Sequence, residues 1–210
     1  MTVITDFTFK LNKLQTINSL LGFENFMDKN ELSILYDSLL PVLYDTVHPY
    51  GIFNIEKSTA FPCMDKYTYA IPCIITLGAH IGEKIDDYFS LKKLSEGIML
   101  NSMANSYLFE ISSQLFEKIY MKTFMIHIGL SPRLSPGGCE LPVEYGKFIL
   151  ENLKSFRIFD ITVNENYMLN PLHSMAYMYG ADEMIPLNKN DHDCGSCPSR
   201  KSCTMRKDLI

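Results

Sequence analysis

The chain has 210 residues, of which 47% are hydrophobic, enough for one domain with a sizeable core. Its 19 basic and 24 acidic residues give a formal net charge of −5, and no basic run or stripe of basic and aromatic residues indicates a nucleic-acid partner. The first six residues lack the cationic start and apolar core of a signal peptide. The longest apolar stretch, around residues 69–79, is too short to span a bilayer. We therefore expect a cytoplasmic protein with no membrane partner.

The apolar spacing predicts helices and strands in a mixed order. In chain order, the expected elements are an edge strand over 3–11, a helix over 14–21, a helix from 28 or 30 to 43, strands over 51–55 and 67–77, a helix after Gly78, a long helix over 91–120, a helix over 143–153, and strands over 157–168 and 173–179. Pro41 is expected to kink or end the second helix. The strand over 67–77 is nearly continuous in apolar residues, which is typical of a central strand. Helices and strands without strict alternation favour the α+β class.

Small polar residues interrupt the apolar stripe of the long helix, at spacings that put them in rows on neighbouring faces. They are Asn101, Ser102, Asn105, Ser106 and Glu110. One interpretation is a solvated face, and the other is a helix that lines a ligand crevice.

Residues 133–142, RLSPGGCELP, combine a cation, two proline corners and paired glycines just before an expected helix. Gly137 and Gly138 can adopt backbone angles closed to other residues, so main-chain N–H groups can approach a ligand closely. Arg133 offers a planar set of donors suited to a carboxylate. The same letters are also compatible with an ordinary surface turn.

A second segment, residues 164–171 (NENYMLNP), follows about twenty residues later, with Ser174 just beyond it. This pair of segments resembles the activation domain of cobalamin-dependent methionine synthase and its stand-alone relatives. Upstream, residues 74–78 (IITLG) resemble a strand of that family, and residues 98–110 resemble its long central helix. The resemblance covers roughly residues 10–180 and implies a bent antiparallel sheet with packed helices.

The resemblance also implies a ligand and its site. The family domain binds S-adenosylmethionine and remethylates a cobalamin that has oxidised to cob(II), after one electron from a flavodoxin-like donor. By this likeness Arg133 pairs with a ligand carboxylate, Ser135, Gly137 and Gly138 line the ligand, and Glu165 holds the adjacent strand or accepts from the ligand amine. Glu110 is a further candidate carboxylate, although relatives carry their acidic residue one position earlier.

The chain departs from the family at two places. Relatives carry tyrosine where this chain has Gly138, which removes an aromatic surface against which a ligand packs. A tyrosine-containing segment of the family is replaced here by residues 182–210. We therefore expect an activation-domain-like domain over 1–181 and a C-terminal tail over 182–210.

The tail carries a cysteine cluster, Cys194, Cys197 and Cys203, preceded by His192. Clustered thiols in a cytosolic chain indicate metal binding, a redox-active dithiol or a loose reduced tail. With Cys139 as fourth ligand, four thiolates suit an iron–sulfur cluster or zinc; with His192 instead, a zinc site is expected. The other cysteines, Cys63 and Cys73, are expected to be buried small hydrophobes, and His173 is a possible polar ligand contact.

These features lead to two candidate functions. The first is an accessory protein that reactivates a corrinoid-dependent methyltransferase or methionine synthase, by methylation from S-adenosylmethionine or by electron delivery from a metal cluster. The chain has no cobalamin-binding D-x-H-x-x-G motif, so the cobalamin is expected to belong to the partner, and a flavodoxin or ferredoxin is a possible donor. The second is a non-enzymatic, zinc-stabilised module that binds a corrinoid protein.

Overall fold

Two long antiparallel strands form the centre of the protein, β4 (Tyr69–Thr76) and β8 (Ser174–Asp182), which pair from Tyr69–Ala181 to Thr76–Ser174. A computed structural model of the chain describes residues 1–20, 27–138, 140–154, 159–187, 189, 191–192, 195 and 201. Within this part, one sheet has the order β1-β2-β4-β8-β5, with β3 on β4, and every strand pair is antiparallel. The shorter strands of this sheet are β1 (Thr2–Ile4), β2 (Tyr50–Phe53), β3 (Glu56–Lys57) and β5 (Gly129–Leu130).

Side chains of β4 alternate between two buried layers, which explains its nearly continuous apolar sequence. Ile71, Cys73 and Ile75 belong to one core cluster, whereas Ala70 and Ile74 belong to the other. Pro72 is tolerated in this central strand because it lies between residues 73–76, which pair with β2, and residues 69–70, which pair with β3. The predicted central strand is confirmed.

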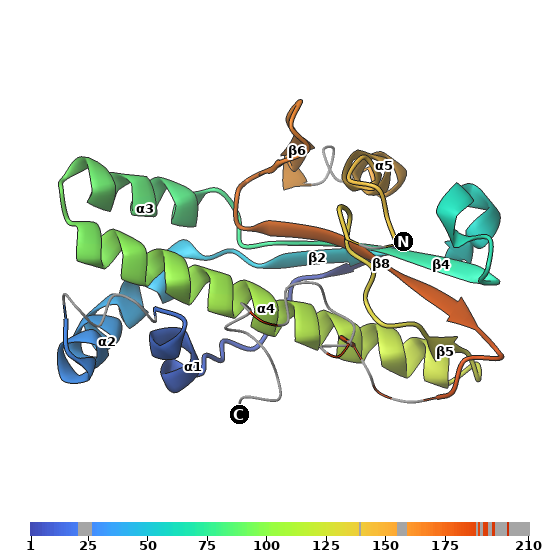
Figure 1. Cartoon of the computed structure of the whole chain (residues 1–210), viewed down its shortest axis with the longest axis horizontal. Helices are drawn as coiled ribbons and strands as arrows, with labels where there is room; N and C mark the ends of the chain where they lie inside the picture. Colours follow the sequence, from blue (N-terminus) through green and yellow to red (C-terminus); the bar gives the residue numbers. More distant parts are fainter. Residues whose placement is uncertain are drawn as a thin grey trace.

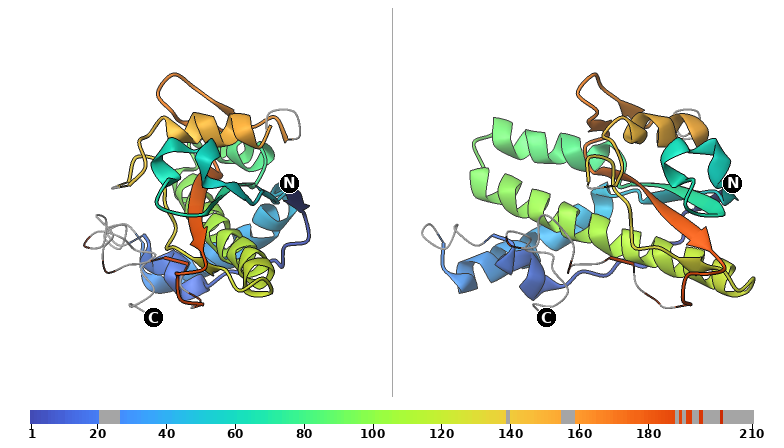
Figure 2. Two further views of the ribbon diagram at one scale, coloured as in Figure 1. Left: turned by 90° about the vertical axis from the view of Figure 1, so that its right-hand side faces the viewer. Right: turned by 45° about the vertical axis from the view of Figure 1, so that its right-hand side comes forward.

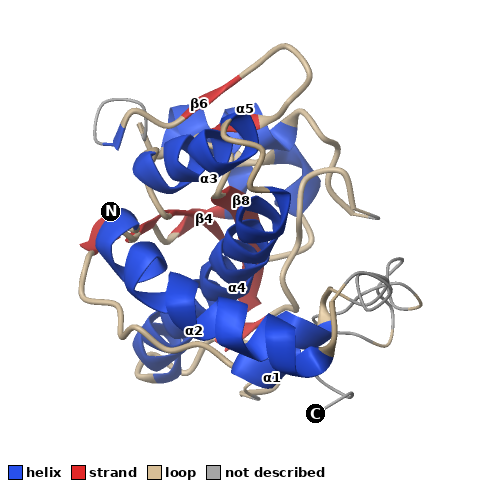
Figure 3. Cartoon of the chain, turned by 90° about the vertical axis from the view of Figure 1, so that its left-hand side faces the viewer, coloured by secondary structure: helices blue, strands red, loops and turns tan. Residues whose placement is uncertain are grey.

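Helices cover both faces of the sheet (Figure 1). One face carries α1 (Lys13–Asn18), α2 (Lys29–Thr46), α3 (His80–Ser90) and the long α4 (Leu94–Phe124). The other carries α5 (Tyr145–Asn152) and two short 3-10 helices, η2 (Ser58–Ala60) and η3 (Pro62–Met64). Figure 2 shows the sheet between these layers, and Figure 3 shows α1, α2 and α4 stacked on one side. The predicted α+β class, with a bent antiparallel sheet and packed helices, is confirmed.

Helix α2 begins where the sequence indicates and continues further than expected. Asp28 accepts hydrogen bonds from the N–H groups of Asn30 and Glu31, and the Glu31 carboxylate accepts from the Asp28 N–H, a complete capping box. Pro41 was predicted to kink or end the helix, and the second alternative is wrong, because α2 runs on to Thr46. Pro41 and Asp37 are both exposed, so water can reach the carbonyl that loses its N–H donor.

Helix α4 extends along the sheet and buries two of the five residues of its polar row, Ser102 and Ser106. Ser102 and Ser106 are 9% and 8% exposed, so the solvated-face interpretation is wrong for them, whereas Asn105 is exposed as that interpretation requires. The Ser102 hydroxyl lies 2.6 Å from that of Ser19, just after α1, which ties the two helices together. In the described part of the chain, no helix combines the length and apolarity needed to cross a membrane.

The predicted strand over residues 157–168 is wrong. Among its described residues, only β6 (Thr162–Val163) is extended and paired, and it forms a small separate hairpin with β7 (Leu169–Asn170). The Asn164 side chain accepts from the N–H groups of Asn166 and Met168, and such Asx-type bonding favours a turn over a continuous strand. The next predicted strand, over 173–179, is confirmed as β8.

Candidate functional site

Arg133 lies in a segment that follows the outer edge of β8 beyond β5. The Ser131 N–H donates to the Gly180 carbonyl at 2.8 Å, and the Gly180 N–H donates to the Ser131 hydroxyl at 2.9 Å. Directly after Arg133, the pairing resumes, since Leu134 and Met178 exchange main-chain hydrogen bonds of 2.9 and 2.8 Å. The backbone on both sides of Arg133 is therefore fixed to the central sheet.

The Arg133 side chain is buried and already holds a carboxylate of the same chain, that of Asp191. Arg133 Nη2 and Nε donate to the two Asp191 oxygens at 2.6 and 3.2 Å, and the pair is 6% and 4% exposed at the side chains. The Arg133 main-chain N–H also donates to the Asp191 carbonyl at 2.8 Å. This is the two-point geometry in which a guanidinium binds a carboxylate most strongly.

Other polar groups complete this cluster. Nη2 of Arg133 donates to the Ser112 hydroxyl of α4 at 3.0 Å, the Tyr179 hydroxyl donates to Asp191, and the guanidinium carbon lies 4.4 Å from the centre of the Tyr177 ring. The Tyr177 hydroxyl itself is buried and has no hydrogen-bond partner among the described residues. Asp191, Ser112 and both tyrosines were not among the residues predicted from the sequence. The alternation of β8 indicates that the tyrosines share a face, but no sequence signal connects Asp191 to Arg133.

The protonation states of the cluster follow from its burial. Burial raises the pKa of Tyr177 and of Tyr179 well above the usual value, so both keep their phenolic protons. Burial lowers the pKa of Arg133, but the tyrosines and Asp191 outweigh this and leave its pKa above the usual value. Burial likewise raises the pKa of the Cys73 thiol, which favours an inert core cysteine.

In the glycine loop, residues 135–138, the N–H groups of Gly137 and Gly138 bond to carbonyls of the same turn. The Gly137 N–H donates to the Leu141 carbonyl at 2.9 Å and the Gly138 N–H donates to the Ser135 carbonyl at 3.0 Å. Gly137 has a φ of +78°, the left-handed conformation that favours glycine. Ser135, Gly137 and Gly138 are exposed, so a ligand can contact their surface, but these two donors are engaged in closing the turn.

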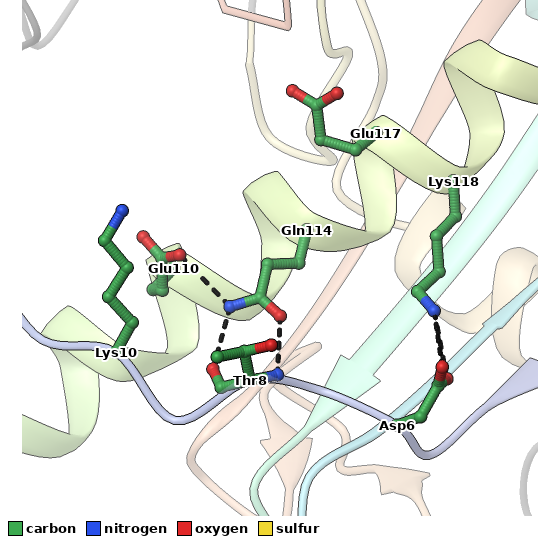
Figure 4. A pocket seen from close by; sticks show the side chains of 7 residues that line it. All are labelled: Asp6, Thr8, Lys10, Glu110, Gln114, Glu117 and Lys118. Atoms are coloured by element: carbon green, nitrogen blue, oxygen red, sulfur yellow. Dashed lines mark hydrogen bonds and ion pairs between the residues drawn. The ribbon is translucent and has the colours of Figure 1, made fainter.

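Glu110 points into a different region of the surface from Arg133. It lines an open pocket of about 510 Å³ between α4 and the N-terminal segment (Figure 4), with Asp6, Thr8, Lys10, Gln114, Glu117 and Lys118. Gln114 donates to Glu110 at 3.1 Å and exchanges hydrogen bonds with the main chain of Thr8. Since Glu110 and Ser112 are two residues apart on α4, they point roughly 200° apart around the helix. The structure therefore does not bring Glu110 to the Arg133 cluster.

Glu165 lies at the exposed turn between β6 and β7, outside the main sheet. His173, just before β8, lies near the N-terminal part of α4, with its Nε2 3.0 Å from the Oδ1 of Asn101, which is eleven residues before Ser112. Burial lowers the pKa of His173, opposed by the charge of Asp86, and its Nδ1 has no partner among the described residues. The predicted roles of Glu165 and His173 in ligand binding stay predictions, as do those of Arg133 and the glycine loop.

The proposed metal ligands Cys139, Cys194, Cys197 and Cys203 lie outside the described residues. Among the residues that the structure does describe, no three His, Cys, Asp or Glu side chains are gathered to hold a metal ion. The other two cysteines were predicted to be buried. This is confirmed for Cys73 and wrong for Cys63, which is exposed within η3, where its N–H donates to the Tyr145 hydroxyl.

Comparison with known proteins supports the fold and leaves the sequence relationship distant. No protein-family profile matches the chain, and no curated protein matches it. A solved structure, the reactivation domain of MetH bound to AdoHcy, superimposes with a TM-score of 0.61 over 80% of this chain and 70% of that one. The two share 12% sequence identity. The architecture described above is therefore that of the MetH reactivation domain.

Proposed function

We propose that this chain is an accessory protein that reactivates a corrinoid-dependent methyltransferase, with S-adenosylmethionine as the methyl donor. The observation that carries the proposal is the shared architecture with a domain that is named for MetH reactivation and was solved with AdoHcy bound. AdoHcy is the product left when S-adenosylmethionine gives up its methyl group, so a similar fold with this ligand supports methyl donation to a cobalamin. The cobalamin is a substrate here and belongs to the partner protein.

The proposed reaction balances with one external electron. The partner's cob(II)alamin accepts one electron, from a flavodoxin or ferredoxin, and becomes the cob(I) nucleophile. Cobalt then forms a bond to the methyl carbon while the carbon–sulfonium bond breaks, leaving methylcobalamin and the neutral thioether of S-adenosylhomocysteine. No proton moves, so this chain needs no acid or base and acts by holding the sulfur and methyl in line with cobalt.

The proposed ligand site consists of the buried Arg133 guanidinium and the exposed loop from Ser135 to Gly138 beside it. Two features of the structure support it. The sheet fixes the backbone around Arg133, which provides the rigidity that positioning requires, and the loop beside it is exposed. Glu110 and Glu165 lie elsewhere, so their contribution requires a ligand or partner that reaches beyond this surface.

We propose further that Cys139, Cys194, Cys197 and Cys203 form a metal site. Four thiolates fit either an iron–sulfur cluster or tetrahedral zinc, and His192 is the alternative fourth ligand for zinc. The pairing of Arg133 with Asp191 supports this, because Cys139 follows Arg133 by six residues and Cys194 follows Asp191 by three. An iron–sulfur cluster supplies one electron at a time, whereas zinc supplies only stability.

One observation favours the alternative, a non-enzymatic module that is stabilised by zinc and binds a corrinoid protein. The donors that a ligand would use are engaged within the chain, since Arg133 holds Asp191 and the N–H groups of Gly137 and Gly138 close their own turn. A chain that kept the fold and lost the ligand would show this arrangement. The test must therefore separate ligand-dependent activity from binding to the partner.

The test uses a cobalamin-dependent methionine synthase that lacks its own activation domain and has been oxidised to cob(II). This chain, reduced flavodoxin and S-adenosylmethionine are added together, and recovered methyl transfer is measured beside the affinity of the two proteins. Under the proposal activity returns, and it is lost in Arg133→Ala but kept in the control Lys147→Ala, which changes an exposed cation of α5. If the proteins bind but activity never returns, the binding module is the correct function.

A further inference from the structure

Three described residues of the C-terminal segment, Leu187, Lys189 and Asp191, make contacts that run from α4 to Arg133. The Leu187 carbonyl accepts from the Tyr120 hydroxyl at 3.4 Å, Lys189 forms an ion pair with Glu117, and Asp191 binds Arg133 next to Ser112. The contacts on α4 thus move from Tyr120 toward its N-terminus as the segment advances. A segment that can leave this path would take the Asp191 carboxylate with it.

Asp191 uses the part of Arg133 that a ligand carboxylate would need. A guanidinium binds a carboxylate by two parallel N–H groups on one edge. The Nε and Nη2 groups of that edge both donate to Asp191, and Nη2 donates in addition to Ser112. Tyr179 and the main-chain N–H of Arg133 bind Asp191 as well, so the residue occupies a site made of four donors.

We propose that Asp191 is a specificity-determining residue, whose carboxylate fills the subsite for the carboxylate of an S-adenosyl amino acid. A ligand with a carboxylate must displace Asp191 before Arg133 can bind it, whereas a ligand without one leaves the pair intact. The wild-type chain thereby gains little affinity from a ligand carboxylate that Arg133 would otherwise recognise, because the displaced Asp191 competes for the same donors. This inference rests on the proposed function, because it takes the ligand to be an S-adenosyl compound.

The test compares two ligands that differ by this carboxylate alone, S-adenosylmethionine and its decarboxylated analogue, by calorimetry at fixed ionic strength. The wild-type protein is expected to bind both with similar dissociation constants. Asp191→Ala is expected to bind S-adenosylmethionine at least about tenfold more tightly, because an apparent dissociation constant equals the intrinsic one divided by the open fraction of the site. The analogue gains no such affinity. Glu183→Ala, which removes an exposed negative charge from the same segment, leaves both constants unchanged.

The outcomes separate this inference from the proposed function. If both ligands bind and Asp191→Ala changes them equally or not at all, Asp191 does not determine specificity, although the ligand site stands. If neither ligand binds the wild-type protein or any variant, the proposed ligand site is wrong and the inference falls with it.

A second measurement uses the wild-type protein and so does not depend on how the variant folds. Displacement of Asp191 releases the segment that contains Lys189, which makes the bond after Lys189 more accessible to trypsin. S-adenosylmethionine is expected to accelerate cleavage there, and the decarboxylated analogue is not. Equal cleavage rates with both ligands bound would contradict the inference.

Discussion

The effect of Asp191→Asn on the free energy of unfolding shows whether the Arg133–Asp191 contact can be released or is a permanent part of the core. Asp191→Asn keeps the shape of the side chain and removes its charge. If the segment stays in place, Arg133 remains buried without a counter-charge, and breaking one partner of a buried ion pair costs about 3–5 kcal/mol. If the segment leaves, water hydrates the guanidinium, and only the contacts of the segment are lost.

Among the described residues, those contacts include the main-chain hydrogen bond from Arg133, the bond from Tyr179, the bond from Tyr120 to the Leu187 carbonyl, and a half-exposed ion pair at Lys189. Release of the segment returns backbone entropy, which offsets the loss of these contacts. We therefore expect Asp191→Asn to lower the free energy of unfolding by less than about 3 kcal/mol, the lower limit for an unpaired buried charge.

The measurement is urea unfolding followed by far-ultraviolet circular dichroism, with Glu183→Gln as the charge control. The midpoint should shift while the slope of the transition stays constant, which shows that stability and not compactness has changed. A loss of more than about 3 kcal/mol in Asp191→Asn would refute the reasoning, because it would show that Asp191 stays in place and cannot yield to a ligand.

Three further predictions concern the core and the cysteines. Burial lowers the pKa of His173, so the folded state favours its neutral form. The free energy of unfolding is therefore expected to fall as the pH drops below about 6.5, the pKa of an unfolded histidine. In urea titrations at several pH values, His173→Asn is expected to weaken this pH dependence. A Cβ at Gly180 would lie 2.2 Å from the Tyr67 ring, so Gly180→Ala is expected to lower the free energy of unfolding by about 1–3 kcal/mol. The decrease is expected to be smaller when Tyr67→Leu is also present. An equal decrease in both backgrounds would contradict the contact. The third measurement assays iron, sulfide and zinc in protein purified without oxygen. Cys139→Ser is expected to lose metal, whereas the control Cys63→Ser, which changes an exposed cysteine, is expected to keep it. Equal metal content in the two variants would exclude Cys139 as a ligand.

Elements with a strong local signal could be predicted from the sequence. The capping residues Asp28 and Glu31 marked the start of α2, and the apolar run of β4 marked a strand buried on both faces. The end of α2 could not be predicted in the same way, because the cost of Pro41 inside the helix depends partly on whether water reaches the carbonyl that it leaves unpaired. That exposure depends on which face of α2 packs on the sheet, which is decided by tertiary structure.

The strand predicted over residues 157–168 failed for a different reason. Apolar and β-branched residues there satisfy strand propensity, but Asn164 offers its side chain to nearby N–H groups and closes a turn instead. The consequence reaches the candidate site, because Glu165 moves from the main sheet to the tip of a separate hairpin. A local competition for hydrogen bonds thus relocated a predicted ligand contact.

The environment of Arg133 was beyond sequence reasoning for a physical reason that applies to any motif containing a cation. A motif specifies which donors a loop presents, but a buried cation must be neutralised by some carboxylate, and the sequence does not say whose. Here the carboxylate comes from Asp191, 58 residues further along the chain, in a segment without a helix or strand signal. The identity of that counter-charge decides between a site that binds its ligand through Arg133 and one that first has to release its own tail.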